Sequence, residues 1–304
     1  MREGQTFAGD SLLARYASFV KLPHTLFALP FAGVGAILGS RAVPSGVTPA
    51  AVIWIIVAFT AARFAAMGFN RIVDREHDAA NPRTRLREIP SGRLSVAQAS
   101  VAVAVAAVLF ILAAWQLNPL CGWLSPLALG WVFFYSYTKR FTALAHLVLG
   151  FGLAMSPVGA YLAVTGSWSE PWWALLVLAA AVTFWVAGFD IIYAVQDEAF
   201  DRAQGLHSIP ARLGARRALL VARLIHGLAV LAFGATWFIF PVGRLYLGGV
   251  AMMAVLLHFG HAGLRGQDSG NLDPVRIDRA FFKVNVAVST GFLVFTLLDR
   301  IFQW

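Results

Sequence analysis

The sequence predicts an all-α, polytopic membrane protein. Hydrophobic residues make up 59% of the 304 residues and charged residues only 13%, a balance far more apolar than that of soluble domains. The mean hydropathy of +0.71 leads to the same conclusion. The apolar residues are also gathered into long runs, and an α-helix needs about 20 consecutive apolar residues to cross a bilayer.

Nine stretches of the chain have this length and composition, and they predict nine transmembrane helices within a single domain, residues 1–304. They cover residues 24–40, 48–70, 95–116, 120–137, 143–163, 171–195, 215–239, 242–262 and 280–302. Ahead of the first stretch, residues 11–23 place apolar side chains at helical spacing between Arg15 and Lys21, as an interfacial amphipathic helix would. A frayed extension of the first span explains that pattern nearly as well.

The basic residues predict the orientation of these helices. Of the 24 Lys and Arg residues, 18 fall in the N-terminal segment and in the loops after the second, fourth, sixth and eighth stretches. Because Lys and Arg collect on the cytoplasmic side, we expect a cytoplasmic N-terminus and, after nine spans, a C-terminus outside. The net charge of +9 then reflects attraction to anionic membrane lipid and requires no nucleic acid as a partner.

Two groups of acidic residues interrupt this apolar pattern. Asn70, Asp74 and Asp78 are spaced by four residues at the end of the second stretch, and Asp197 and Asp201 repeat the interval at the end of the sixth. Residues at this spacing share one face of an α-helix, so each group should present several oxygen atoms together. By the predicted orientation, both Asp-rich motifs are cytoplasmic.

The two motifs also indicate a duplicated helical unit. Residues 70–90 resemble residues 190–210, with Ile-Pro at the end of each segment, and the aspartate pairs repeat the same interval. We therefore predict two diverged halves, about 24–163 and 171–302. Chance similarity is the alternative, since the identities are few.

Paired carboxylates of this kind suit a hard divalent cation. Mg²⁺ takes oxygen ligands, usually a few carboxylates together with substrate phosphates and water. Two opposed carboxylate faces would hold a metal-bound diphosphate, and its departure from an allylic carbon is assisted by metal ions and basic side chains. The single cysteine, Cys121, excludes a Cys-based zinc site, and the seven His are scattered without ligand spacing.

Two other interpretations of the aspartates stay open. They could be solvated loop charges paired with neighbouring Arg residues. That explanation would suffice for a single motif, but the occurrence of two matched motifs favours a functional site. They could also form the ion site of a cation-coupled transporter. Transport sites usually lie near the middle of the bilayer, whereas these carboxylates lie at helix ends, so the pattern favours an enzyme.

The residues around both motifs carry a family resemblance. They read Asn70-Arg-Ile-Val-Asp74-Arg-Glu-His-Asp78, then Asn81-Pro-Arg-Thr84 and Pro90-Ser-Gly-Arg93, and later Asp190-Ile-Ile-Tyr193-Ala-Val-Gln-Asp197-Glu-Ala-Phe-Asp201. This pattern resembles the UbiA superfamily of intramembrane prenyltransferases over most of the chain. The resemblance implies nine transmembrane helices around a central cavity that opens to lipid. It also implies Mg²⁺-dependent transfer of a polyprenyl group from polyprenyl diphosphate to a small aromatic acceptor.

The same resemblance implies roles for individual residues. The Mg²⁺ ligands would be Asp74, Asp78, Asp197 and Asp201, with Asn70 binding substrate. Lys139 would contact the diphosphate, although snorkelling of its side chain explains its position at a helix end equally well. Arg63 is a further candidate, because it lies two turns inside the second stretch, where a charge is costly unless it has a function.

Asp190 and Tyr193 lie about two turns and one turn before Asp197 in the sixth stretch. They could orient the acceptor's hydroxyl group or take the ring proton after alkylation. A hydrogen bond between helices explains them about equally well. We expect them to be the catalytic candidates of the second motif.

The acceptor is less firmly indicated. In the best-known hydroxybenzoate enzymes of the superfamily the first motif commonly continues Asn-Asp, whereas here Arg71 follows Asn70. Residues 21–30 and 87–93 look like a bacterial branch often labelled 4-hydroxybenzoate polyprenyltransferase, some members of which are thought to prenylate 1,4-dihydroxy-6-naphthoate in the futalosine route to menaquinone. We expect 4-hydroxybenzoate as acceptor, in quinone biosynthesis at a bacterial inner membrane, with the naphthoate as the alternative.

Overall fold

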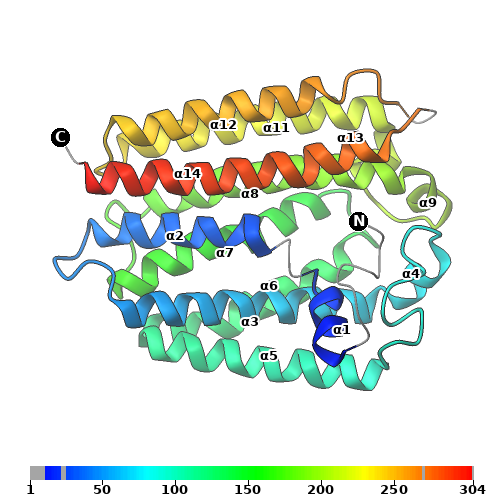
Figure 1. Cartoon of the computed structure of the whole chain (residues 1–304), viewed down its shortest axis with the longest axis horizontal. Helices are drawn as coiled ribbons and strands as arrows, with labels where there is room; N and C mark the ends of the chain where they lie inside the picture. The colour runs from blue at the N-terminus through cyan, green and yellow to red at the C-terminus, as the bar shows by residue number, and fades with distance from the viewer. Residues whose placement is uncertain (1–10, 22–24, 269–270, 303–304) are drawn as a thin grey trace. The chain divides into compact units, whose positions relative to one another are not determined.

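The structure is a computed structural model that describes residues 11–21, 25–268 and 271–302. Within these ranges it is built of helices and contains no β-strand, as predicted for an all-α protein (Figure 1). The longer helices are α2 (Thr25–Ser40), α3 (Pro49–Val73), α5 (Val96–Leu117), α6 (Pro119–Thr138), α7 (Ala145–Thr165), α8 (Ala174–Ala194), α11 (Ala215–Ala235), α12 (Arg244–Ala262) and α14 (Val284–Ile301). The shorter ones are α1 (Leu12–Phe19), α4 (Arg75–Ala80), η2 (Val195–Asp197), α9 (Glu198–Ala203), α10 (Ile209–Leu213), η3 (Thr236–Phe238), α13 (Pro274–Asp278) and η4 (Arg279–Lys283).

Each predicted stretch coincides with one of the longer helices, although residue 24, where the first was predicted to begin, lies outside the described residues. Among the described residues, seven helices are long and apolar enough to cross a membrane: α3, α5, α7, α8, α11, α12 and α14, some with a short continuation. In α2 only Ala28–Ser40 is counted, as a shorter apolar helix. The helices thus indicate an integral, multi-pass membrane protein, and nine spans stay a prediction.

The helices form two compact units. One consists of Met1–Leu26 and Val52–Tyr137, and the other of Phe27–Ala51 and Thr138–Trp304. These boundaries differ from the predicted halves, 24–163 and 171–302, because a compact unit follows the packing of helices whereas a duplicated half follows the sequence. The duplication stays a prediction.

In the first unit, α3, α5 and α6 pack through small and apolar side chains. Ala65 of α3, Ala106 of α5 and Leu129 of α6 form one buried cluster. The predicted amphipathic segment forms α1, and Phe19 at its end is fully buried in a second cluster beside Leu94. Small residues allow helices to approach closely, which matters in a bilayer because apolar surface gains little by leaving lipid.

In the second unit, α8 is the central helix and packs against both α7 and α11, while α12 packs against α14. The side chain of Phe31, from α2, joins these helices. Its ring lies 4.7 Å from that of Trp185, 5.5 Å from that of Phe233 and 5.8 Å from that of Phe292, measured between centroids. All four rings are buried, and aromatic pairs at these separations stabilise beyond their buried area.

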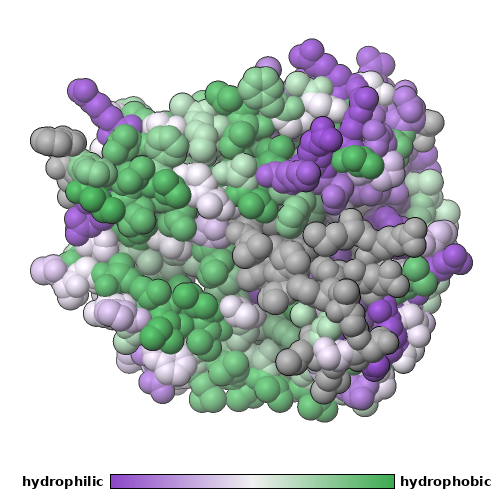
Figure 2. Space-filling model, in the orientation of Figure 1, coloured by the Kyte–Doolittle hydropathy of each residue, from purple (hydrophilic) through white to green (hydrophobic). Residues whose placement is uncertain are grey.

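The outward faces of the long helices are apolar. Leucines at helical spacing are exposed along α11, namely Leu220, Leu224, Leu228 and Leu231, and α5 exposes Val101, Val105, Val108 and Leu112 in the same way. Figure 2 shows apolar side chains along α12 and α14, with hydrophilic side chains gathered where α12 gives way to α13. Exposed apolar stripes of this size are unusual in soluble monomers and suit contact with lipid.

Asp299 of α14 holds the beginning of α12. Its Oδ2 accepts a hydrogen bond from Gly243 N at 2.7 Å, and its Oδ1 accepts one from Tyr246 N at 3.2 Å. Arg41 Nη2, just after α2, forms an ion pair with Asp299 Oδ2 at 2.8 Å, and both side chains are 3% exposed. A carboxylate at a helix N-terminus satisfies amide groups that have no partner within the helix. One side chain therefore ties α2, α12 and α14 together.

The substitution Asp299→Asn is expected to destabilise the second unit. The amide cannot balance the buried charge of Arg41, and removing one partner of a buried ion pair costs about 3 kcal/mol or more. The measurement is the midpoint of thermal unfolding of the purified protein in detergent. Asp278→Asn, at an exposed position of α13, is the matched control and should leave the midpoint unchanged. Equal midpoints for the two variants would contradict the role given to Asp299.

Candidate functional site

The first motif lies on the side of α3 that is opposite its packed face. The buried positions in the second half of α3 recur at helical spacing: Ala61, Ala65, Gly68 and Arg71. Arg63 and Asn70 lie on the other side and are half-buried. The helical path continues past the end of α3, because Asp74 N donates to Asn70 O at 2.9 Å. The packing of α3 thus places Arg63, Asn70 and Asp74 along one line.

The two aspartates of this motif are buried, with Asp74 3% and Asp78 6% exposed. Asn70 Nδ2 donates to Asp74 Oδ2 at 3.2 Å, and Arg87 Nη1 donates to Asp78 Oδ1 at 2.7 Å. The second oxygen of Asp78, Oδ2, is buried without a hydrogen-bond partner among the described residues. Leaving such an oxygen unsatisfied is costly, and it is the state expected of an oxygen that binds a ligand.

Arg71 turns away from the aspartates into the packed side of the unit. Its Nη1 lies 3.1 Å from Oε2 of Glu88, which is fully buried. Glu88 Oε1 accepts a second hydrogen bond, from Ser18 Oγ of α1, at 2.7 Å. The Arg71 guanidinium also lies 6.0 Å from the ring centroid of Phe19. Arg71, which replaces the Asp of the Asn-Asp pattern, therefore pairs with Glu88 in the loop after the motif, and through Glu88 it is linked to α1.

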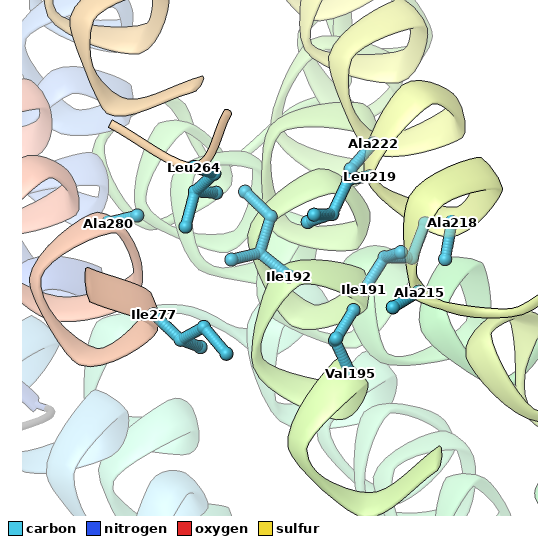
Figure 3. Packing of buried hydrophobic residues seen from close by; sticks show 10 residues of the cluster. All are labelled: Ile191, Ile192, Val195, Ala215, Ala218, Leu219, Ala222, Leu264, Ile277 and Ala280. Carbon is cyan, nitrogen blue, oxygen red and sulfur yellow. The ribbon is translucent and has the colours of Figure 1, made fainter. Parts of the chain in front are cut away.

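The second motif shows the same division of a helix into two faces. Ile191 and Ile192 of α8, with Val195 at the start of η2, pack against the first turns of α11 and against residues in and near α13 (Figure 3). Asp190 and Tyr193 lie on the opposite side of α8 and are only half-buried. The chain continues through η2 into α9, so Asp197 and Asp201 follow Asp190 at helical spacing.

Asp190 is held by a histidine of the neighbouring helix. His146 Nδ1, at the beginning of α7, lies 2.7 Å from Asp190 Oδ2. The His146 side chain is 6% exposed and that of Asp190 is 21% exposed, so the carboxylate is the accessible member of the pair. Tyr193, by contrast, packs its ring against Phe281 with a centroid distance of 4.3 Å.

Lys139 lies with the second motif. His207 N donates to Lys139 O at 2.6 Å, which ties the turn after α6 to the loop after α9. Lys139 and Asp197 both act electrostatically on Asp201, and the Ser208 hydroxyl donates a hydrogen bond to the Asp201 carboxylate. The structure thus groups Asp197, Asp201 and Lys139 within the second unit, with Asp190 on the same face of the helical path, and groups Asn70, Asp74 and Asp78 within the first. Arg63 lies on the same side of α3, about two turns before Asn70.

The sequence profile of the UbiA prenyltransferase family matches residues 28–286, which contain both motifs. The chain belongs to the UbiA prenyltransferase family. This UbiA protein is therefore a prenyltransferase, as predicted, and membership of the family favours the enzyme over the cation-coupled transporter. A 4-hydroxybenzoate octaprenyltransferase from Aromatoleum aromaticum is 30% identical to it over 225 residues, 73% of each chain. One from Dechloromonas aromatica is 28% identical over 220 residues, 71% of this chain and 73% of the relative.

Solved structures of other UbiA proteins have the same fold. The apo structure of a UbiA homolog from Aeropyrum pernix K1 superposes with a TM-score of 0.81 at 34% identity, over 91% of this chain and 98% of that one. A UbiA homolog from Archaeoglobus fulgidus, solved with GPP and Mg²⁺ bound, gives a TM-score of 0.72 at 17% identity, over 94% of this chain and 99% of that one. At that identity the second comparison supports the fold alone.

The residues of both motifs in this UbiA protein fit Mg²⁺. Their donors are carboxylate and amide oxygens, which Mg²⁺ prefers, and Asp78 Oδ2 is a buried oxygen without a protein partner in the part of the chain that the structure describes. Among the same residues, no three His, Cys, Asp or Glu side chains are grouped closely enough to hold a metal by themselves. A Mg²⁺ ion at either pair would therefore need phosphate or water to complete its ligands.

The sequence analysis missed four residues that the structure places at the motifs. They are Arg87 at Asp78, Glu88 at Arg71, His146 at Asp190 and Ser208 at Asp201. Arg87 and Glu88 belong to the loop that carried the family resemblance, and their polarity just before Ile-Pro was the available signal. His146 is the first polar residue of an apolar stretch, but a lone His at that position gives no indication of its partner.

Glu88→Gln is expected to destabilise the first unit of this UbiA protein, because it removes the negative charge that Glu88 places 3.1 Å from the buried Arg71 guanidinium. Removal of one partner from a buried ion pair lowers the free energy of unfolding by about 3 kcal/mol or more. The measurement is the midpoint of thermal unfolding in detergent, which should fall. Glu76→Gln is the matched control, since Glu76 pairs with Arg75 at the surface with its side chain 80% exposed. If both variants unfold at the temperature of the unmodified protein, the Arg71–Glu88 pair is not a stabilising contact.

Proposed function

We propose that this protein transfers a polyprenyl group from polyprenyl diphosphate to 4-hydroxybenzoate in the biosynthesis of respiratory quinones. The observation that carries the proposal is the relative from Aromatoleum aromaticum, named 4-hydroxybenzoate octaprenyltransferase and 30% identical over 73% of this chain. A relative from Synechocystis named 4-hydroxybenzoate solanesyltransferase is 34% identical over 140 residues. The two relatives share an acceptor in their names and differ in the prenyl group.

In this proposal the two motifs bind the diphosphate end of the donor. Mg²⁺ would be held by Asp74, Asp78, Asp197 and Asp201. When bound, the ion would neutralise charge on the departing pyrophosphate. Asn70 would hydrogen-bond substrate from the polar side of α3. Arg63 and Lys139 would supply positive charge for the diphosphate, because fixed cations stabilise a leaving group best in a site that excludes water.

The remaining polar residues of α8 would serve the acceptor. During transfer the bond between C1 of the prenyl chain and the diphosphate oxygen breaks, and the ring carbon ortho to the acceptor's hydroxyl bonds to C1. That ring carbon then loses its proton. We assign the proton to Asp190, because its carboxylate is the accessible member of the pair with His146, whereas the Tyr193 ring packs against Phe281. Tyr193, one turn further along the same face, would orient the acceptor's hydroxyl.

We further propose that the site opens to the cytoplasmic side of a bacterial inner membrane. The basic residues that follow the second and sixth predicted stretches support this orientation. A site at helix ends lets the charged diphosphate stay near water while the prenyl chain remains among apolar helices.

The acceptor is tested with the purified protein, Mg²⁺ and radiolabelled farnesyl diphosphate, with 4-hydroxybenzoate and 1,4-dihydroxy-6-naphthoate supplied separately. The expected product is prenylated 4-hydroxybenzoate, lost on addition of EDTA and restored by excess Mg²⁺. Product with the naphthoate alone would show that the acceptor is 1,4-dihydroxy-6-naphthoate, the alternative raised by Arg71 in place of the Asp that commonly follows Asn in the first motif. Absence of product with both acceptors, from protein of normal thermal midpoint, would contradict the proposal.

The metal assignment is tested by Asp74→Asn and Asp197→Asn, one variant in each motif. Each amide removes a negative charge that would bind Mg²⁺, and the turnover is expected to fall by about 10²-fold or more. Asp278→Asn is the control for loss of an exposed carboxylate and should retain normal turnover. Near-normal turnover by either variant would contradict the assignment of that motif as a Mg²⁺ site.

A further inference from the structure

The beginning of α7 carries a buried polar residue that the proposed chemistry does not use. His146 is 5% exposed and lies in a mostly apolar helix. Its imidazole makes two contacts, one through each nitrogen. Nδ1 lies 2.7 Å from Asp190 Oδ2, and Nε2 lies 3.4 Å from the backbone nitrogen of Ile209.

These two partners assign the tautomer of the imidazole. The Ile209 N–H can only donate, so Nε2 must accept and carries no proton. The ring proton is therefore on Nδ1, and it is donated to the Asp190 carboxylate. A separation of 2.7 Å is typical of a hydrogen bond to a charged acceptor, which is stronger than one between neutral groups. His146 thus holds Asp190 by donating the Nδ1 proton to its carboxylate.

The close approach of α7 to α8 fixes where the imidazole lies. Gly150 packs on the backbone of Thr183, and a side chain at Gly150 would collide with the Thr183 carbonyl. His146 is one turn before Gly150, and Asp190 is two turns after Thr183, so both pairs belong to the same antiparallel contact. The close approach brings the beginning of α7 against the end of α8, and the two hydrogen bonds of the imidazole show its direction.

The second bond of the imidazole reaches the other half of the motif. Ile209 begins α10, and the residue before it, Ser208, caps α10 by accepting from Ala211 N at 3.2 Å. The Ser208 hydroxyl also donates to Asp201. One imidazole therefore fixes Asp190 directly, and through the Ile209 amide it fixes the turn that hydrogen-bonds Asp201.

We propose that His146 is a positioning residue for prenyl transfer, which sets the Asp190 carboxylate and the turn beside Asp201 for reaction with the aromatic acceptor. This inference rests on the proposed function. Asp190 is the more accessible member of the pair, as expected of a carboxylate that is held from behind and meets substrate in front. A residue that only completes the helix packing would not need a partner on the polar face of α8.

The test compares three variants of His146 that differ in whether the new side chain has an N–H donor, and at which nitrogen position of the imidazole that donor lies. The side chain in His146→Asn ends near the position of Nδ1 and can still donate to Asp190. In His146→Gln the amide extends toward the position of Nε2, and in His146→Leu no donor remains. The kcat and the KM of acceptor and donor are measured for each, together with the thermal midpoint. His258→Asn, at an exposed histidine of α12, is the matched control and should behave as the unmodified protein.

The expected result is a fall in kcat of about 10²-fold in His146→Leu, since small displacements of reacting groups have effects of that size. The KM of the donor should change little, and His146→Asn should recover most of the lost kcat while His146→Gln does not. A merely structural histidine would instead give losses that follow the thermal midpoint, with no difference between Asn and Gln. Normal kcat in folded His146→Leu would overturn the inference.

Two controls keep the outcomes separate. If His146→Leu does not fold, the comparison of His146→Asn with His146→Gln decides, and equal kcat values for these two overturn the inference. If the unmodified protein makes no prenylated product with either acceptor, the proposed function fails. Active unmodified protein with His146 variants of equal kcat removes only the role of His146.

Discussion

Two buried ion pairs, one in each unit, join separate parts of the chain, and the packing of the helices within each unit depends on them. An ionised group inside an apolar helix bundle is strongly unfavourable unless another group compensates it. Asp299 is paired with Arg41, 258 residues earlier, and Glu88 with Arg71. The first pair fixes the beginning of α12, and the second fixes the loop after the first motif.

The same constraint explains why both motifs lie on helices with two unlike faces. In α3 the packed face is made of Ala65, Gly68 and neighbouring small residues, and in the end of α8 it is made of isoleucine and valine. In each case the buried face decides which way the polar residues turn. Packing in a bilayer rewards close approach of small or well-fitted surfaces more than burial itself. The orientation of the aspartates is thus a consequence of the packing on the other side of the helix.

The sequence predicts those features that depend on local pattern. The apolar stretches coincide with the long helices because run length is a local property, and Asp190 shares a face with Asp197 because helical periodicity is local too. The pairs Arg71–Glu88 and His146–Asp190 join residues 17 and 44 positions apart through loops and neighbouring helices. No periodicity connects such residues, and a lone histidine in an apolar stretch does not identify its partner. In α2, which contains Pro30, the predicted helix forms, and its described apolar part, Ala28–Ser40, is shorter than the predicted span.

Each aspartate pair is also accompanied by a cation that a loop brings to it. Arg87 pairs with Asp78, and Lys139 lies close enough to act on Asp201. Carboxylates four residues apart on a helix repel each other, and a fixed cation lowers that cost. At Asp78 the cation contacts only one of the two carboxylate oxygens. Arg87 donates to Oδ1, whereas Oδ2 is buried without a protein partner among the described residues. Such an arrangement compensates part of the negative charge within the protein and leaves one oxygen of Asp78 for the cation of the proposed site. The loops that supply Arg87 and Lys139 therefore belong to the site as fully as the aspartates do, because they determine how much negative charge each pair presents.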